Sequence, residues 1–166
     1  MIPVFSIIGS RSNTGKTTIL CKIIRELKNR GYRVATIKHH MGDFDIDHSG
    51  KDTWKHAQAG ADIVMISSPV KMAKIEKVQE EYKLDDIISK IENVDIIITE
   101  GYKRENKPKL EVIRKEISEK LISKEEDLFA IVTDFPLKNQ IPQFNFEQVI
   151  EIVDLIEKRF LKNDLN

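Results

Sequence analysis

The sequence has a single cysteine, no excess of charge of either sign and no long hydrophobic run. One cysteine, Cys21, excludes an internal disulfide, and its apolar neighbours predict a buried core thiol. Lysine plus arginine and aspartate plus glutamate each number 27, so a broad basic surface for a nucleic acid is not expected. No apolar run approaches the roughly 18 residues that span a bilayer, and residues 1–9 lack the basic segment of a signal peptide. We therefore expect a cytoplasmic protein that binds neither membrane nor nucleic acid.

The 166 residues have an ordinary globular composition, with 40% hydrophobic and 33% charged residues. Short β-branched runs predict strands at 2–8, 33–38, 62–67, 70–78, 94–99, 110–114 and 128–133. Helical spacing of apolar residues predicts helices at 15–30, 53–59, 84–92 and 146–160. The run 94–99 (VDIIIT) is almost wholly apolar, as in a parallel strand covered on both faces. The alternation predicts one domain over residues 1–166, with a three-layer α/β fold and a mostly parallel central sheet.

The clearest motif is SRSNTGKT at residues 10–17, between the first predicted strand and the first predicted helix. It matches the end of the P-loop pattern G-x-x-x-x-G-K-[ST], which binds nucleotide phosphates in this strand–loop–helix context. Gly15 lets the backbone approach the phosphates closely. Successive backbone N–H groups at the positive end of the helix form an anion-binding concavity. The loop residues that precede the glycine in this concavity are Ser12, Asn13 and Thr14.

Two side chains of the motif carry its chemistry. Lys16 supplies a positive charge to the β- and γ-phosphates of a nucleotide, as a catalytic as well as a binding group. Thr17 offers a hydroxyl to Mg²⁺, which prefers oxygen ligands. One position departs from the pattern, because Ser10 stands where the first glycine is usual and Gly9 lies one place earlier. The sequence therefore predicts a P-loop NTPase fold with a tolerated serine.

Carboxylates elsewhere complete the predicted site. Glu100 directly follows the apolar run 94–99, and ligands of doubly wound sheets lie at the carboxyl ends of strands. We expect Glu100 to act on the metal or on the attacking water. The segment 38–52 is rich in histidine and aspartate, and Asp47 and Asp52 are further metal-ligand candidates. Asp52 could equally be a helix N-cap, and the segment could be a γ-phosphate sensor, a transition-metal site or a solvated loop.

Two later features bear on specificity. Asp134 ends the strand predicted at 128–133, where its carboxylate could accept hydrogen bonds from the N1–H and N2–H₂ groups of guanine. The N-K-x-D guanine motif is absent from this part of the sequence. Basic residues after Glu100 form a stretch that either attracts a phosphate-bearing substrate or is solvated; they are Lys103, Arg104, Lys107 and Lys109.

Several stretches together resemble the molybdopterin-guanine dinucleotide biosynthesis protein B (MobB) family: TGKTTIL, TIKHH, FDIDHSGKDTWKHAQAGAD and ITEGYKRENKPKLEVIR. The resemblance covers most of residues 2–114. It implies a homodimer that binds GTP with Mg²⁺, hydrolyses it slowly, and works with the molybdenum cofactor guanylyltransferase that joins GMP to molybdopterin. It also adds Thr18 to the phosphate loop, places Asp52 and Glu100 near the magnesium ion, and assigns residues 70–78 to a shared sheet.

Two other functions fit the same fold. An ATP-dependent small-molecule kinase or ligase could hold its acceptor on the basic stretch, although no arginine-bearing lid segment is evident. A metallochaperone GTPase could use His39, His40 and His48 for nickel or a similar ion. The chain has only four histidines, however, and proteins of this kind often carry a longer histidine-rich tract. Nucleotide preference and metal binding would separate the three hypotheses.

Overall fold

A computed structural model describes residues 1–162 of the chain. The chain divides into two compact units, Met1–His39 with Leu84–Asn166 as the first and His40–Lys83 as the second. The second unit is thus an insertion into the sequence of the first. The expectation of one domain over residues 1–166 stays a prediction. No helix within residues 1–162 combines the length and apolar character that crossing a membrane requires.

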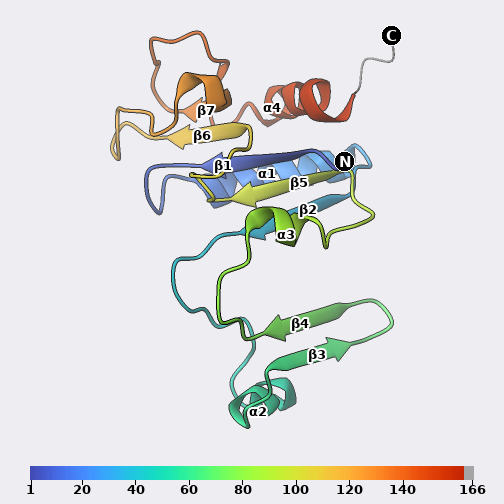
Figure 1. The fold of residues 1–166 in the computed structure, drawn as a ribbon. Coiled ribbons are helices and arrows are strands. Elements are labelled where there is room, and N and C mark those ends of the chain that lie inside the picture. The colour runs from blue at the N-terminus through green and yellow to red at the C-terminus, as the bar shows by residue number, and fades with distance from the viewer. Residues whose placement is uncertain (163–166) are drawn as a thin grey trace. The chain divides into compact units, whose positions relative to one another are not determined.

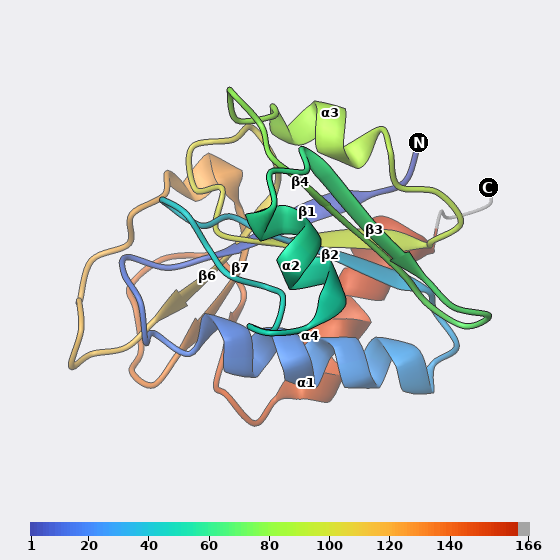
Figure 2. The same ribbon diagram turned by 90° about the horizontal axis from the view of Figure 1, so that it is seen from below.

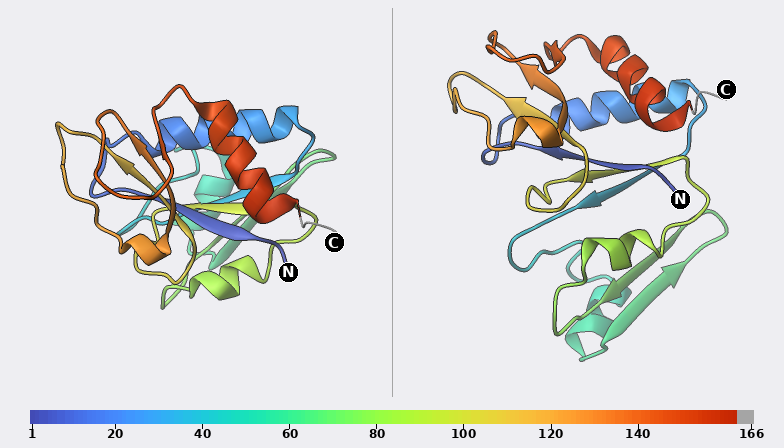
Figure 3. Two further views of the ribbon diagram at one scale, coloured as in Figure 1. Left: turned by 90° about the horizontal axis from the view of Figure 1, so that it is seen from above. Right: turned by 45° about the horizontal axis from the view of Figure 1, so that its top comes forward.

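The first unit is built on a six-stranded parallel sheet with the order β2-β5-β1-β6-β7-β8. Helices α1 and α4 lie on one face of this sheet, and α3 lies on the other (Figures 2 and 3). The three-layer α/β fold with a parallel central sheet is therefore confirmed. The strands are β1 (Val4–Ile8), β2 (Val34–Lys38), β5 (Ile96–Glu100), β6 (Lys109–Ile113), β7 (Leu128–Thr133) and β8 (Gln143–Phe144). The helices are α1 (Lys16–Asn29), α3 (Leu84–Ile88), the 3₁₀ turn η1 (Glu125–Asp127), α4 (Val149–Ile156) and the π-helical turn η2 (Glu157–Leu161).

The sheet and α1 take their places by burying apolar residues. Every residue of β5, β6 and β7 is buried, as expected for strands covered on both faces. Helix α1 buries one stripe and ends where Gly31 adopts a φ of 89° and Tyr32 N–H donates to Leu27 O. The prediction that Cys21 is buried is wrong, because this residue is exposed. Cys21 follows Leu20 by one residue, and this 100° rotation takes it off the buried stripe.

Several predicted boundaries are also corrected. The helix predicted at 146–160 begins at Val149 and continues from Glu157 as a π-helical turn. The helix predicted at 84–92 ends at Ile88. Short β8 and η1 have too few residues for a periodic pattern and were not predicted.

The second unit contains a helix and an antiparallel hairpin. Helix α2 (Asp52–Gln58) is followed by β3 (Ile63–Ser67) and β4 (Met72–Glu76), which pair only with each other among the described residues. The strand expected at 70–78 is thus β4. Lys51 rather than Asp52 is the N-cap of α2, so the alternative role for Asp52 as an N-cap is wrong. Asp52 is instead the first helical residue, where its charge favours the positive end of the helix.

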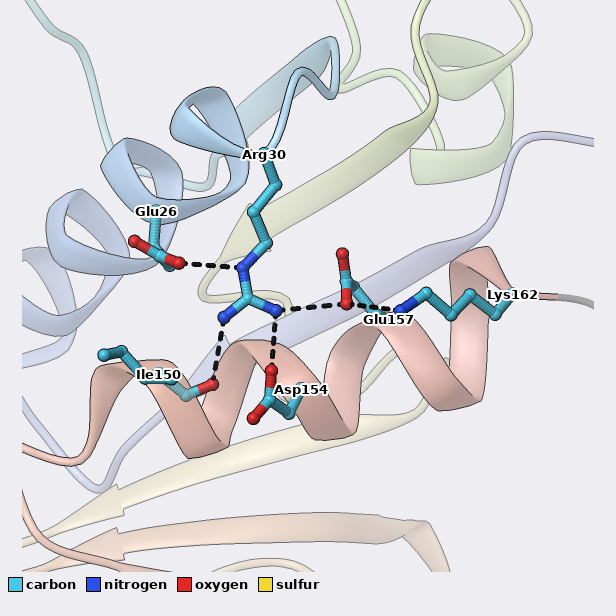
Figure 4. Close-up of polar contacts among 6 residues, drawn as sticks. All are labelled: Glu26, Arg30, Ile150, Asp154, Glu157 and Lys162. Atoms are coloured by element: carbon cyan, nitrogen blue, oxygen red, sulfur yellow. Dashed lines mark hydrogen bonds and ion pairs between the residues drawn. The ribbon is translucent and has the colours of Figure 1, made fainter.

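A charged cluster joins α1 to α4 and η2, as Figure 4 shows. Arg30 Nε donates to Glu26 Oε1 at 2.7 Å, and Arg30 Nη1 donates to Asp154 Oδ1 at 2.7 Å and to Glu157 Oε2 at 3.0 Å. The Glu157 side chain is only 9% exposed and also accepts from Lys162. Because these partners come from both ends of the chain, the cluster fixes α4 against α1.

Arg30→Ala should lower the free energy of unfolding by about 1–3 kcal/mol, because it leaves a nearly buried carboxylate with fewer donors. Urea denaturation measures this change. Arg25→Ala is the matched control, since Arg25 lies on the exposed side of the same helix. An equal loss of stability in both variants would contradict a specific role for the cluster.

Candidate functional site

The predicted site residues of the first unit gather at one edge of the sheet. All six strands are parallel, so their carboxyl ends meet at the same edge (Figure 1). β5 lies directly between β1 and β2, which is the arrangement required to bring Glu100 close to the P-loop. The groups at this edge are the loop 9–15 after β1, Lys38 at the end of β2, Glu100 at the end of β5, Arg114 after β6 and Asp134 after β7.

The backbone of the P-loop is shaped to receive an anion. Asn13 has a φ of 63° and Gly15 a φ of 96°, and such left-handed residues turn successive N–H groups toward one side. The N-terminal hydrogen bond of α1 runs from Ile19 N–H to Gly15 O at 3.0 Å. The N–H groups of the three residues before Ile19, which include Thr17 and Thr18, therefore lack an intrahelical acceptor. No acidic residue in the first turn neutralises the positive end of the helix.

Gly9 supplies the close approach that the usual first glycine would provide. A Cβ atom on Gly9 would lie 2.7 Å from Thr14 Oγ1 and 2.9 Å from Val112 O. Neither contact is sterically possible without movement of the loop or of β6. The P-loop tolerates Ser10, which is partly exposed, because the tight position is Gly9. The sequence pattern shows Gly9 only as a displaced glycine, and this packing role was not predicted.

Lys16 lies across the loop. Its ammonium group donates to Arg11 O at 2.6 Å and to Thr14 Oγ1 at 3.2 Å. Partial burial lowers the pKa of Lys16; Glu100 opposes this shift, and the nearby ammonium groups of Lys103 and Lys38 add to it. The cation therefore lies in a site that already holds other positive charge, and an added anion would be stabilised there.

Thr17 and Glu100 bring two hard oxygen atoms together at this edge of the sheet. Thr17 Oγ1 donates to Glu100 Oε1 at 2.8 Å, and the Glu100 side chain is only 11% exposed. Adjacent ligands of an octahedral Mg²⁺, with bonds of about 2.0–2.1 Å, lie roughly 2.9 Å apart. The separation of the two oxygens fits a shared magnesium ion, and the ion would compensate a carboxylate that is otherwise costly to bury.

Arg114 joins the P-loop to the segment that follows β7. Its Nε donates to Thr14 O at 3.2 Å, and its Nη1 lies 3.5 Å from Asp134 Oδ2. The guanidinium carbon lies 4.0 Å from the centroid of the Phe146 ring. Arg114 was not predicted as a site residue. Its place at the end of a predicted strand was the one signal available, and its contacts with the other loops have no signature in the sequence.

Asp134 borders a pocket of about 350 Å³. The pocket is lined by Thr133, Asp134, Phe135, Pro136, Gln143, Phe144 and Asn145. Asp134 Oδ1 accepts from the N–H of Lys115 at 2.9 Å, which orients the carboxylate. The apolar and amide side chains around one fixed carboxylate could hold a planar heterocycle.

Asp47 and Asp52 belong to the second unit. Asp47 Oδ1 accepts from His48 N–H at 2.8 Å, whereas Oδ2 is covered and has no hydrogen-bond partner among the described residues. The Thr53 side chain and the His48 N–H hold the pKa of Asp47 below its usual value. Asp52 is exposed and lies 3.5 Å from Lys55. No three His, Cys, Asp or Glu side chains within residues 1–162 converge as a metal site.

The expectation of one basic stretch after Glu100 is wrong for Lys109. Lys109 is a buried residue of β6 and pairs with Asp127 at 3.0 Å. Lys107 pairs with Asp85 at 2.6 Å. Strand β6 begins earlier than predicted, and this takes Lys109 into the sheet. Exposed basic groups of this stretch are Lys103 and Arg104.

The matching family model and two similar relatives indicate the same family. The family described as "Molybdopterin guanine dinucleotide synthesis protein B" (MobB) matches residues 4–134. The chain is 32% identical over 158 residues to the molybdopterin-guanine dinucleotide biosynthesis adapter protein of Haemophilus influenzae, covering 94% of this chain and 88% of that protein. It is 31% identical over 163 residues to the adapter protein of Escherichia coli, covering 94% and 92% of the two chains.

A solved structure agrees with these relatives. The crystal structure of a molybdopterin-guanine biosynthesis protein B is similar to the fold with a TM-score of 0.72 and 31% identity. The alignment covers 93% of this chain and 98% of the solved one. Sequence and fold thus point to the same group of proteins.

Proposed function

Since the chain belongs to the MobB family of molybdopterin-guanine dinucleotide biosynthesis adapter proteins, we propose that it binds GTP with Mg²⁺ and assists the attachment of GMP to molybdopterin. The observation that carries this proposal is the pairing of Thr17 with Glu100 beside a P-loop. A phosphate cradle with a hard-oxygen metal site is the arrangement that P-loop proteins use for nucleoside triphosphates.

Each residue has a proposed role at the site. Backbone N–H groups of the loop and of the first turn of α1 bind the phosphates; the residues concerned are Ser12, Asn13, Thr14, Gly15, Lys16, Thr17 and Thr18. Lys16 turns from Arg11 O to the β- and γ-phosphates, since a carbonyl is a weaker partner than a phosphate. Thr17 and Glu100 would hold Mg²⁺, which would neutralise part of the phosphate charge. Asp47 and Asp52 are further candidates for that ion.

We propose that hydrolysis is slow. An arginine that speeds phosphoryl transfer has to reach the terminal phosphate. The Arg114 guanidinium already contacts Thr14 O, Asp134 and the Phe146 ring. It would have to give up these contacts to reach the terminal phosphate. A slow GTPase suits an adapter whose partner, the molybdenum cofactor guanylyltransferase, carries out the transfer of GMP to the molybdopterin cofactor.

A titration of the chain with GTP and ATP, with and without Mg²⁺, tests nucleotide binding. We expect a preference for GTP that Lys16→Ala weakens by roughly 100-fold, since a charge-assisted phosphate contact contributes about 1.5–3 kcal/mol. Glu100→Gln should remove most of the increase in GTP affinity that Mg²⁺ gives the wild-type chain. A preference for ATP would contradict the proposal and favour a kinase or ligase.

The pocket beside Asp134 is proposed to bind the guanine base. Lys115 N–H and Arg114 orient the Asp134 carboxylate. Each carboxylate oxygen can accept more than one hydrogen bond, so the two oxygens could also accept from N1–H and N2–H₂ of guanine. The pocket follows β7, on the same sheet edge as the phosphate site. A single nucleotide could therefore contact both features.

Asp134→Asn should weaken GTP binding by about tenfold or more. The carboxylate can accept hydrogen bonds from both guanine N1–H and N2–H₂, whereas the asparagine amide offers an NH₂ group in place of one of the two oxygens. The same substitution should weaken the binding of xanthosine triphosphate less, since the C2 carbonyl of xanthine can accept a hydrogen bond from the asparagine NH₂ group. Competition binding measures both affinities. Asp86→Asn, an exposed change in α3, is the control, and equal losses for the two nucleotides would contradict base recognition by Asp134.

We also propose that two copies of the chain associate through the hairpin of the second unit. This hairpin exposes large apolar side chains, with Met65 at 55%, Ile66 at 57% and Met72 at 65%. A two-stranded hairpin has free edges and is marginally stable by itself, so pairing with a second hairpin would stabilise it.

Sedimentation velocity should therefore detect a dimer that Ile66→Lys dissociates. Ile150→Lys is the matched control, because Ile150 is 61% exposed on α4. A wild-type monomer at micromolar concentration, or equal behaviour of the two variants, would argue against this interface.

A further inference from the structure

Lys38 lies beside the proposed metal ligand without an assigned role. It is the last residue of β2, and its Cα is the register partner of Glu100 in β5. Register partners in adjacent strands point to the same face of the sheet. Lys38 Nζ consequently lies 3.8 Å from Glu100 Oε1, the same oxygen that accepts from Thr17. One carboxylate oxygen thus has both a hydroxyl and an ammonium group next to it.

The contact between Lys38 and Glu100 is loose. Its 3.8 Å separation exceeds the 2.7–3.2 Å of an N–H···O hydrogen bond. The Lys38 side chain is 64% exposed, whereas that of Glu100 is 11% exposed. An exposed ammonium group on a flexible stem therefore balances a nearly buried carboxylate, and it can leave if another cation takes over that role.

Positive charge is concentrated around this point. Lys16 begins α1 after the P-loop, Lys38 ends β2, and Lys103 follows the end of β5 by three residues, so all three belong to the same edge of the sheet. Three lysines from three separate segments of the first unit thus act on the volume next to the P-loop. An anion with several charges would relieve their mutual repulsion.

We propose that Lys38 binds the terminal phosphate of a nucleoside triphosphate, after its ammonium group has been released from Glu100 by the bound magnesium ion. This inference rests on the proposed function, because it needs a triphosphate and a metal ion at the P-loop. With the carboxylate neutralised, Lys38 loses its partner and its flexible stem carries the charge to the nearest phosphate oxygens. A nucleoside diphosphate lacks the phosphate concerned, so Lys38 would discriminate between the two nucleotides.

The test compares GTP and GDP affinities, in the presence of Mg²⁺, for wild type, Lys38→Gln and Lys38→Arg by calorimetry. Lys38→Gln should lower the affinity for GTP about tenfold, as expected for the loss of one charge-assisted contact. It should change the affinity for GDP by less than about twofold. Lys38→Arg should keep most of the GTP affinity, because it keeps the charge. Lys158→Gln removes the same charge from an exposed position and should change neither affinity.

Either of two results for Lys38→Gln would overturn the inference while the proposed function stands. These are equal losses of GTP and GDP affinity in Lys38→Gln, and unchanged GTP affinity in that variant. A loss in Lys158→Gln as large as in Lys38→Gln would also overturn it, because net charge would then explain both. A wild-type chain that does not bind GTP would overturn the proposed function and this inference together.

Discussion

The arrangement of the site depends on how the buried negative charge of the Glu100 carboxylate is balanced. It ends a strand in which every residue is buried, and a buried carboxylate needs donors or cations nearby. The Thr17 hydroxyl, from the first turn of α1, and the Lys38 ammonium group, from the end of β2, meet this need. Because β5 lies between β1 and β2, the requirement joins the P-loop to the end of β2. The same requirement makes the position suitable for a divalent cation.

The rest of the sheet edge is held together by contacts that cross between loops. Arg114 contacts the P-loop backbone, Asp134 and the Phe146 ring, and so links segments that follow three different strands. Gly9 permits the closest approach between the P-loop and β6. The phosphate cradle and the pocket beside Asp134 are therefore parts of one connected edge. We infer that a nucleotide bound there would contact both.

The sequence predicted the parts of the site that depend on local pattern. The loop before α1 carries a recognisable motif, and the strand before Glu100 is a continuous apolar run. The order of the parallel strands then brings Glu100 to Thr17. Contacts between distant loops were not predictable, because a single sequence carries no pairing information for residues such as Arg114. Cys21 and Lys109 were misjudged because a shift of one residue changes the face of a helix or the end of a strand. Family resemblance, rather than residue pattern, suggested guanine and the partner enzyme.

The most direct test of the account is a crystal structure of the chain with Mg²⁺ and a non-hydrolysable GTP analogue. The account predicts phosphates against the N–H groups of the P-loop and a magnesium ion next to Thr17 Oγ1 on the Glu100 side. It also predicts the base in the pocket beside Asp134. A nucleotide bound away from this sheet edge, or a metal ion that contacts neither Thr17 nor Glu100 directly or through water, would contradict the central claim.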